Sequence, residues 1–136
     1  MKKRNIWQKN YEKSLETHED DRGTIQDIFY KSEIKHVAII VSKPNAIRGN
    51  HYHKDSIQHI LITKGSLEYW YKKLDSNEKS QSIIIREGDM ITTPPYEIHA
   101  LKILENGCEF IAFSEGLRGG KDYEKDTFRV ESIINK

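Results

Sequence analysis

The hexapeptide Arg48-Gly49-Asn50-His51-Tyr52-His53 carries two histidines separated by a single residue. Alternate side chains of an extended segment project to the same face, so the two imidazoles are predicted to point the same way. A third histidine, His99, follows the turn signal Pro94-Pro95 near the other end of the chain. Three imidazoles would act together if the fold brings His99 to the cavity that His51 and His53 face.

From Thr24 onward, short segments rich in β-branched and aromatic residues alternate with turn signals that contain glycine, asparagine, aspartate or proline. Nine strands are predicted, at residues 24–30, 34–42, 47–53, 58–64, 66–73, 81–86, 90–93, 97–104 and 108–114. No gap between them is wide enough for a crossover helix, which favours a sandwich or barrel over a βαβ sheet. The predicted fold class is therefore all-β, in a single domain.

The composition restricts the partners of the chain. Its 136 residues allow one hydrophobic core, and 22 lysines and arginines balance 21 aspartates and glutamates. Such a balance gives no net field that attracts nucleic acid or a lipid surface. Cys108 is the only cysteine, and the basic N-terminus contains no apolar run long enough for a signal peptide or membrane span. We expect a cytoplasmic protein that binds neither nucleic acid nor membrane.

Three segments are distinguished along the chain. Residues 1–22 are highly charged and are predicted to form an N-terminal arm, while residues 23–115 hold the strands of the barrel. Residues 116–136 open with a glycine-rich stretch and are expected to pack back onto the barrel or onto a partner, anchored by Tyr123 and Phe128. Because short barrels leave edge strands open, a homodimer is expected.

Two chemistries suit three converging imidazoles. Together with the carbonyl oxygen of Gln58 as a weak fourth ligand, they can bind a first-row divalent metal such as Zn, Fe, Mn or Ni. They can instead act as acid and base groups, because histidine titrates at about pH 6.5 unless perturbed. Arg48 lies three residues before His51, so a cation and a base stand together, as proton abstraction next to a carbonyl requires.

These residues resemble the two motifs of the cupin superfamily, a family of jelly-roll barrels. In the first motif, His51, Tyr52 and His53 form the HxH, Gln58 stands at the position of a glutamate, and Gly65 is the closing glycine. The second motif is matched by Gly88, Pro94 and His99. The neutral amide of Gln58 is a poorer cation ligand than the usual carboxylate.

A closer resemblance covers residues 21–130. The string Arg48-Gly-Asn-His-Tyr-His53 is similar to that of cupins that act on nucleotide-linked keto-sugars: 4-keto-rhamnose 3,5-epimerases, sugar 3,4-ketoisomerases, and the C-terminal cupin of bifunctional capsule-polysaccharide enzymes. The late string Asp122-Tyr-Glu-Lys-Asp126 resembles that of the ketoisomerases. The resemblance implies that His51 is the base and that Arg48 holds a phosphate or the developing enolate. It makes His53 either a second proton carrier or a metal ligand.

Tyr69 and Tyr71 share one face of the predicted strand 66–73, which can stack a nucleobase or pack as core. With Arg48 and His99 they are the candidate substrate-binding residues. The leading hypothesis is an isomerase or epimerase for a nucleotide-diphosphate 4-keto-hexose in the biosynthesis of cell-surface polysaccharide, a reaction that requires no redox cofactor. Its rivals are a metal-dependent oxygenase or lyase that uses His51, His53, Gln58 and His99, and a non-enzymatic cupin that binds a small ligand.

Overall fold

The computed structural model of the protein describes residues 1–9, 11–116 and 119–135. Its strands are β1 Lys2–Asn5, β2 Thr17–Asp20, β3 Gly23–Gln26, β4 His36–Ser42, β5 Ile47–Tyr52, β6 Ile57–Lys73, β7 Gln81–Arg86, β8 Asp89–Thr93, β9 Glu97–Glu115 and β10 Phe128–Arg129. A 3-10 helix, η1, spans Gly120–Asp126. The predicted all-β class is confirmed.

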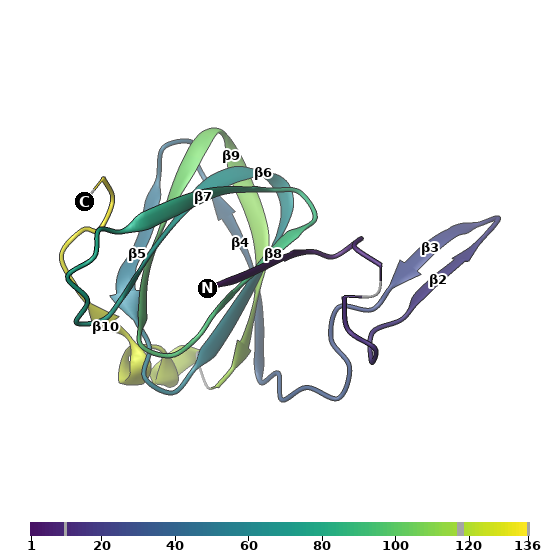
Figure 1. Cartoon of the computed structure of the whole chain (residues 1–136), viewed down its shortest axis with the longest axis horizontal. Coiled ribbons are helices and arrows are strands. Elements are labelled where there is room, and N and C mark those ends of the chain that lie inside the picture. Colours follow the sequence, from purple (N-terminus) through teal and green to yellow (C-terminus); the bar gives the residue numbers. More distant parts are fainter. Residues whose placement is uncertain (10, 117–118, 136) are drawn as a thin grey trace.

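The barrel is built around two long neighbouring strands, β6 and β9 (Figure 1). The main sheet has the order β1-β8-β6-β9-β5-β10, with β4 added to β9 and β7 added to β6, and all of these pairings are antiparallel. Because β9 pairs with β5 along its first half and with β4 along its second half, one strand connects both sides of the barrel.

Two predicted turns are absent from the barrel. The segments 58–64 and 66–73 form the single strand β6, and 97–104 and 108–114 form the single strand β9. Gly65 and Gly107 lie where these strands cross closely, with φ values of +75° and +73°, and the β6–β9 register shifts on both sides of this point. The local glycine signals therefore mark bulges, where the long ladders bend without ending.

The two ends of the chain add strands to the body. In the N-terminal segment, β1 pairs with β8, whereas β2 and β3 form a hairpin that extends away from the barrel (Figure 1). The predicted boundary between residues 22 and 23 falls at the turn of this hairpin. At the other end, β10 pairs with β5, where Arg129 is the register partner of His51. No helix in the described residues is long and apolar enough to cross a membrane.

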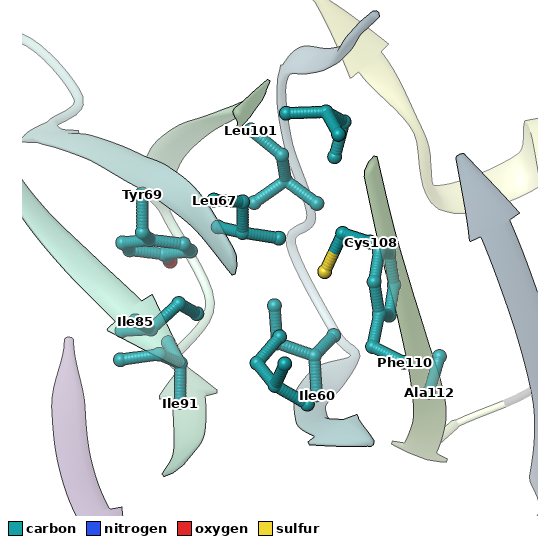
Figure 2. Close-up of a cluster of buried hydrophobic side chains, with 11 residues drawn as sticks. Ile60, Leu67, Tyr69, Ile85, Ile91, Leu101, Cys108, Phe110 and Ala112 are labelled. Carbon is teal, nitrogen blue, oxygen red and sulfur yellow. The ribbon is translucent and has the colours of Figure 1, made fainter. Parts of the chain in front are cut away.

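The hydrophobic core fills one part of the barrel interior. Figure 2 shows its members, among which Leu67, Ile85, Ile91 and Ile103 have no exposed side chain. Burial of an aliphatic side chain of this size contributes about 1.5–3 kcal/mol to folding. Cys108 belongs to this cluster, and burial raises the pKa of its thiol to about 11.

Candidate active site

The structure brings His51, His53 and His99 together inside the barrel. His51 in β5 is the register partner of His99 in β9, and His53 follows two residues after His51. The ring centroids lie 4.6 Å apart for His51 and His99, 4.9 Å for His51 and His53, and 5.2 Å for His53 and His99. His53 and His99 are buried and His51 is half-buried. Solvent therefore reaches the cluster at the His51 ring.

Hydrogen bonds to backbone carbonyls fix the orientation of two of these rings. Nδ1 of His53 lies 2.7 Å from the carbonyl oxygen of Asp126, and Nδ1 of His99 lies 3.2 Å from that of Glu97. A carbonyl oxygen only accepts, so in each ring Nδ1 carries the proton and donates. The lone pair of each neutral ring therefore belongs to Nε2, the nitrogen that can accept a proton or bind a metal.

A cavity of about 120 Å³ opens beside the cluster. Ile60, Leu101 and Phe110, which also belong to the core, form part of its wall, so the cavity and the core are continuous. Its other lining residues are Ile40, Arg48, Gly49, His51, Gln58, Tyr69, Thr93, His99 and Tyr123. The apolar wall excludes water and strengthens electrostatic interactions of the few polar groups.

Arg48 lies at the edge of this cavity with its guanidinium held in place. Its Nε donates to Oγ of Ser42 at 2.7 Å, and Nη2 donates to the carbonyl oxygen of Val41 at 3.4 Å. Among the described residues, no carboxylate forms an ion pair with Arg48. Its positive charge is consequently available to an anionic ligand.

The two candidate tyrosines lie in different surroundings. Tyr69 lines the cavity, but its hydroxyl is hydrogen-bonded to Oγ1 of Thr93, and its ring lies nearly parallel to that of His99 at 6.3 Å. Burial raises its pKa well above the usual value. Tyr71 lies outside the cavity lining and donates to Oε1 of Gln81 at 3.0 Å. Tyr69 thus forms part of the cavity wall, whereas Tyr71 does not line it.

The C-terminal segment adds residues to the site, of which sequence reasoning named Tyr123 only as an anchor of this segment and gave Glu124 and Asp126 no individual role. Tyr123 of η1 lines the cavity, and Asp126 accepts the hydrogen bond from His53. Glu124 binds Arg129 through two hydrogen bonds of 2.7 and 2.9 Å. These bonds, and to a smaller extent the nearby His51, lower the pKa of Glu124. The only signal for these positions was the string Asp122-Tyr-Glu-Lys-Asp126.

The donor set of the cluster fits a divalent transition metal. One ligand nitrogen from each of the three histidines lies within 4.8 Å of the other two. Nitrogens bound to one ion at about 2.1 Å lie no more than about 4.2 Å apart, so small side-chain rotations would close the site. Gln58 lines the same cavity and offers an amide oxygen. These residues would hold the metal, which would act as a Lewis acid at a bound oxygen.

Residues 18–113 match the model of the polysaccharide biosynthesis C-terminal domain family. The chain belongs to this family. No curated protein matches it. The match confirms the predicted resemblance to the C-terminal cupin of capsule-polysaccharide enzymes.

Solved structures confirm the cupin fold of this polysaccharide biosynthesis C-terminal domain. A 3,4-ketoisomerase from Helicobacter canadensis superimposes with a TM-score of 0.69 at 20% identity, over 86% of this chain and 87% of that one. A dTDP-4-dehydrorhamnose 3,5-epimerase from Sulfolobus tokodaii gives 0.69 at 17% identity, over 90% and 86%. The capsular polysaccharide assembling protein CapF from Staphylococcus aureus gives 0.64 at 19% identity, over 90% of this chain and 34% of CapF. This domain therefore spans about a third of the CapF chain.

Proposed function

We propose that this domain epimerises or isomerises a nucleotide-diphosphate 4-keto-hexose in the biosynthesis of a cell-surface polysaccharide, in the cytoplasm. The observation that carries the proposal is the position of His51 and Arg48 in the wall of one cavity that is otherwise largely apolar. Family membership and the structural similarity to a ketoisomerase and an epimerase support the same activity.

The reaction requires only the movement of protons. His51 accepts the proton from the carbon next to the ketone, and the electron pair of the broken C–H bond forms an enolate. The positive charge of Arg48 stabilises either the enolate oxygen or a phosphate of the nucleotide. Return of a proton to the opposite face of the same carbon epimerises it. The ketone moves instead when the hydroxyl on that carbon gives its proton to the enolate oxygen and the former ketone carbon receives the returning proton. No electron leaves the substrate, so the proposal requires no redox cofactor.

Exchange of a substrate proton with solvent tests this function. In D2O, the wild-type protein is expected to introduce at least one deuterium next to the ketone of a nucleotide-diphosphate 4-keto-hexose, measured by mass spectrometry, because an abstracted proton meets solvent before it returns. Absence of exchange with thymidine, uridine and guanosine diphosphate keto-sugars would contradict the proposal.

The three-histidine cluster favours one second candidate, a metal-dependent oxygenase or lyase. Metal analysis of protein purified without chelators separates the two. A stoichiometric transition metal together with no exchange would favour the oxygenase or lyase, with His51, His53 and His99 as ligands.

Arg48→Ala is expected to weaken binding of a nucleotide diphosphate about tenfold or more, which corresponds to about 1.4 kcal/mol. The substitution removes a charge that no described carboxylate neutralises, and charge-assisted hydrogen bonds to phosphate are stronger than neutral ones. Calorimetric titration measures the change. The matched control is Arg22→Ala, because Arg22 is exposed on the hairpin and pairs with Asp20. Equal affinity of the two variants would place the phosphate site elsewhere.

We further propose that the domain forms a homodimer through the outer face of β4. Val37, Ile39 and Val41 alternate along this strand and are 57, 63 and 69% exposed. Among the described strands, β4 pairs only with β9, so its other edge has no strand beside it and can receive a strand of a second copy.

Sedimentation equilibrium is expected to give about twice the chain mass of 16.0 kDa at micromolar concentration. Ile39→Lys should shift the mass toward one chain, because a charge in a buried apolar interface is costly. Ile84→Lys, on the exposed face of β7, is the control. A wild-type mass near one chain across this range would refute the dimer.

A further inference from the structure

Asp126, the last residue of η1, is a buried carboxylate that binds three consecutive backbone N–H groups. Its Oδ1 accepts from Lys54 at 2.7 Å, and its Oδ2 accepts from Asp55 at 3.1 Å and from Ser56 at 2.8 Å. These three groups belong to the loop that directly follows His53. The carboxylate therefore fixes the backbone on the C-terminal side of one of the three clustered imidazoles.

The bonding pattern requires the ionised form of Asp126. Burial by itself would raise the pKa of this carboxyl, but the hydrogen bonds from Lys54, Asp55 and Ser56 outweigh burial and keep the pKa below its ordinary value. A carboxylate accepts at both oxygens, whereas an amide of the same size turns an N–H₂ group toward one of the donors. This site therefore selects aspartate over asparagine.

The backbone of the same residue binds the imidazole itself. The carbonyl oxygen of Asp126 accepts from Nδ1 of His53 at 2.7 Å. Side chain and main chain of Asp126 thus bind two adjacent parts of the segment 53–56. Because the carbonyl is the acceptor, its position relative to the ring depends on how firmly the carboxylate holds residue 126 against the loop.

We propose that Asp126 is a positioning residue for the active site: by anchoring η1 to the loop 54–56, it holds its own carbonyl against Nδ1 of His53. This keeps the proton on Nδ1 and directs the lone pair of Nε2 toward the cluster. The same anchoring places Tyr123 in the cavity wall. The inference rests on the proposed function only for its effect on rate, since the protonation pattern of His53 can be observed in the resting protein.

The test compares Asp126→Asn and Asp126→Ala with Asp122→Ala. Asp122 lies in the same helix but is paired with the exposed Lys125, so it serves as the matched control. Nitrogen-15 NMR of the imidazoles at one fixed alkaline pH, where neutral rings prevail, reports which nitrogen carries the proton. His99 serves as an internal reference, because its Nδ1 is bonded to the carbonyl of Glu97.

Wild type and Asp122→Ala are expected to show His53 in the Nδ1–H form alone. Asp126→Ala should show a mixture of both forms for His53 with His99 unchanged, and Asp126→Asn, which keeps one acceptor oxygen, a smaller change. For Asp126→Ala, the kcat of deuterium exchange should fall by about tenfold or more, while KM changes less than about threefold. An unchanged His53 signal in a folded Asp126→Ala protein would overturn the proposal. Failure of both variants to fold would also overturn it, because Asp126 would then be needed for the fold itself.

These readouts separate the positioning role from the proposed function. If the wild-type protein exchanges no keto-sugar proton, the isomerase assignment fails, while the NMR comparison still decides whether Asp126 controls His53. If exchange occurs but the His53 signal is the same in all folded variants, the isomerase assignment stands and the positioning role fails.

Discussion

His51→Asn is expected to lower solvent-deuterium exchange into the 4-keto sugar by at least about a hundredfold while nucleotide binding is retained. Asparagine is polar and similar in size, but its amide has no nitrogen that accepts and carries a proton near neutral pH. Because Arg48 is unchanged, the phosphate contact should persist. The measurement pairs exchange by mass spectrometry with calorimetric titration of the nucleotide diphosphate.

His18→Asn is the matched control for this experiment, since His18 lies in the separate β2–β3 hairpin and does not line the cavity. A folded His51→Asn protein that exchanges at the wild-type rate would show that another group is the base, with His53 the next candidate. Loss of exchange and binding together would require a folding control by circular dichroism before any role is assigned.

The spacing of His51 and His53 predicted their shared face because a β-strand repeats every two residues. The pairing of His51 with His99 is a long-range register between β5 and β9, which no local pattern encodes. Only the resemblance to the cupin motifs related these distant segments. The structure then supplies what the motifs omit, namely which nitrogen carries the proton in the rings of His53 and His99.

Tyr71 shows where a period of two is insufficient. Tyr69 and Tyr71 share a face of β6, and both were candidates for the substrate site. The curved barrel carries the later residue beyond the cavity, to a second pocket that Met1 and Glu97 also line. Alternation determines the direction of a side chain relative to its sheet, whereas barrel curvature determines which cavity it reaches.

Asp126 could not be found by a local pattern either. Its hydrogen-bond partners lie 70–73 residues earlier in the chain, and its burial depends on how η1 docks against the loop after β5. The composition of the tail is typical of a solvated segment, with charged residues at nine of the 21 positions 116–136. Contacts of this range appear only when the barrel has formed.

Gly65 has the closest backbone approach of any described glycine in the chain. It adopts φ +75°, and a Cβ placed there would lie 2.1 Å from the carbonyl oxygen of Gly107. The crossing of these two glycines lets β6 and β9 continue as single strands through the bulge. Gln58 and Tyr69, on either side of Gly65 in β6, both line the cavity, so this crossing helps to set the width of the site.

Gly65→Ala is therefore expected to lower the free energy of unfolding by about 3–5 kcal/mol, since a methyl group in contact with backbone forces the strands apart and adds strain at positive φ. Urea denaturation measures the loss. Gly120→Ala is the matched control, because Gly120 has φ +53° but no atom within 4 Å of an added Cβ. It should cost only the strain, about 1–2 kcal/mol. If the two variants lose equal stability, the close approach of β6 and β9 does not require glycine, and positive φ alone accounts for Gly65.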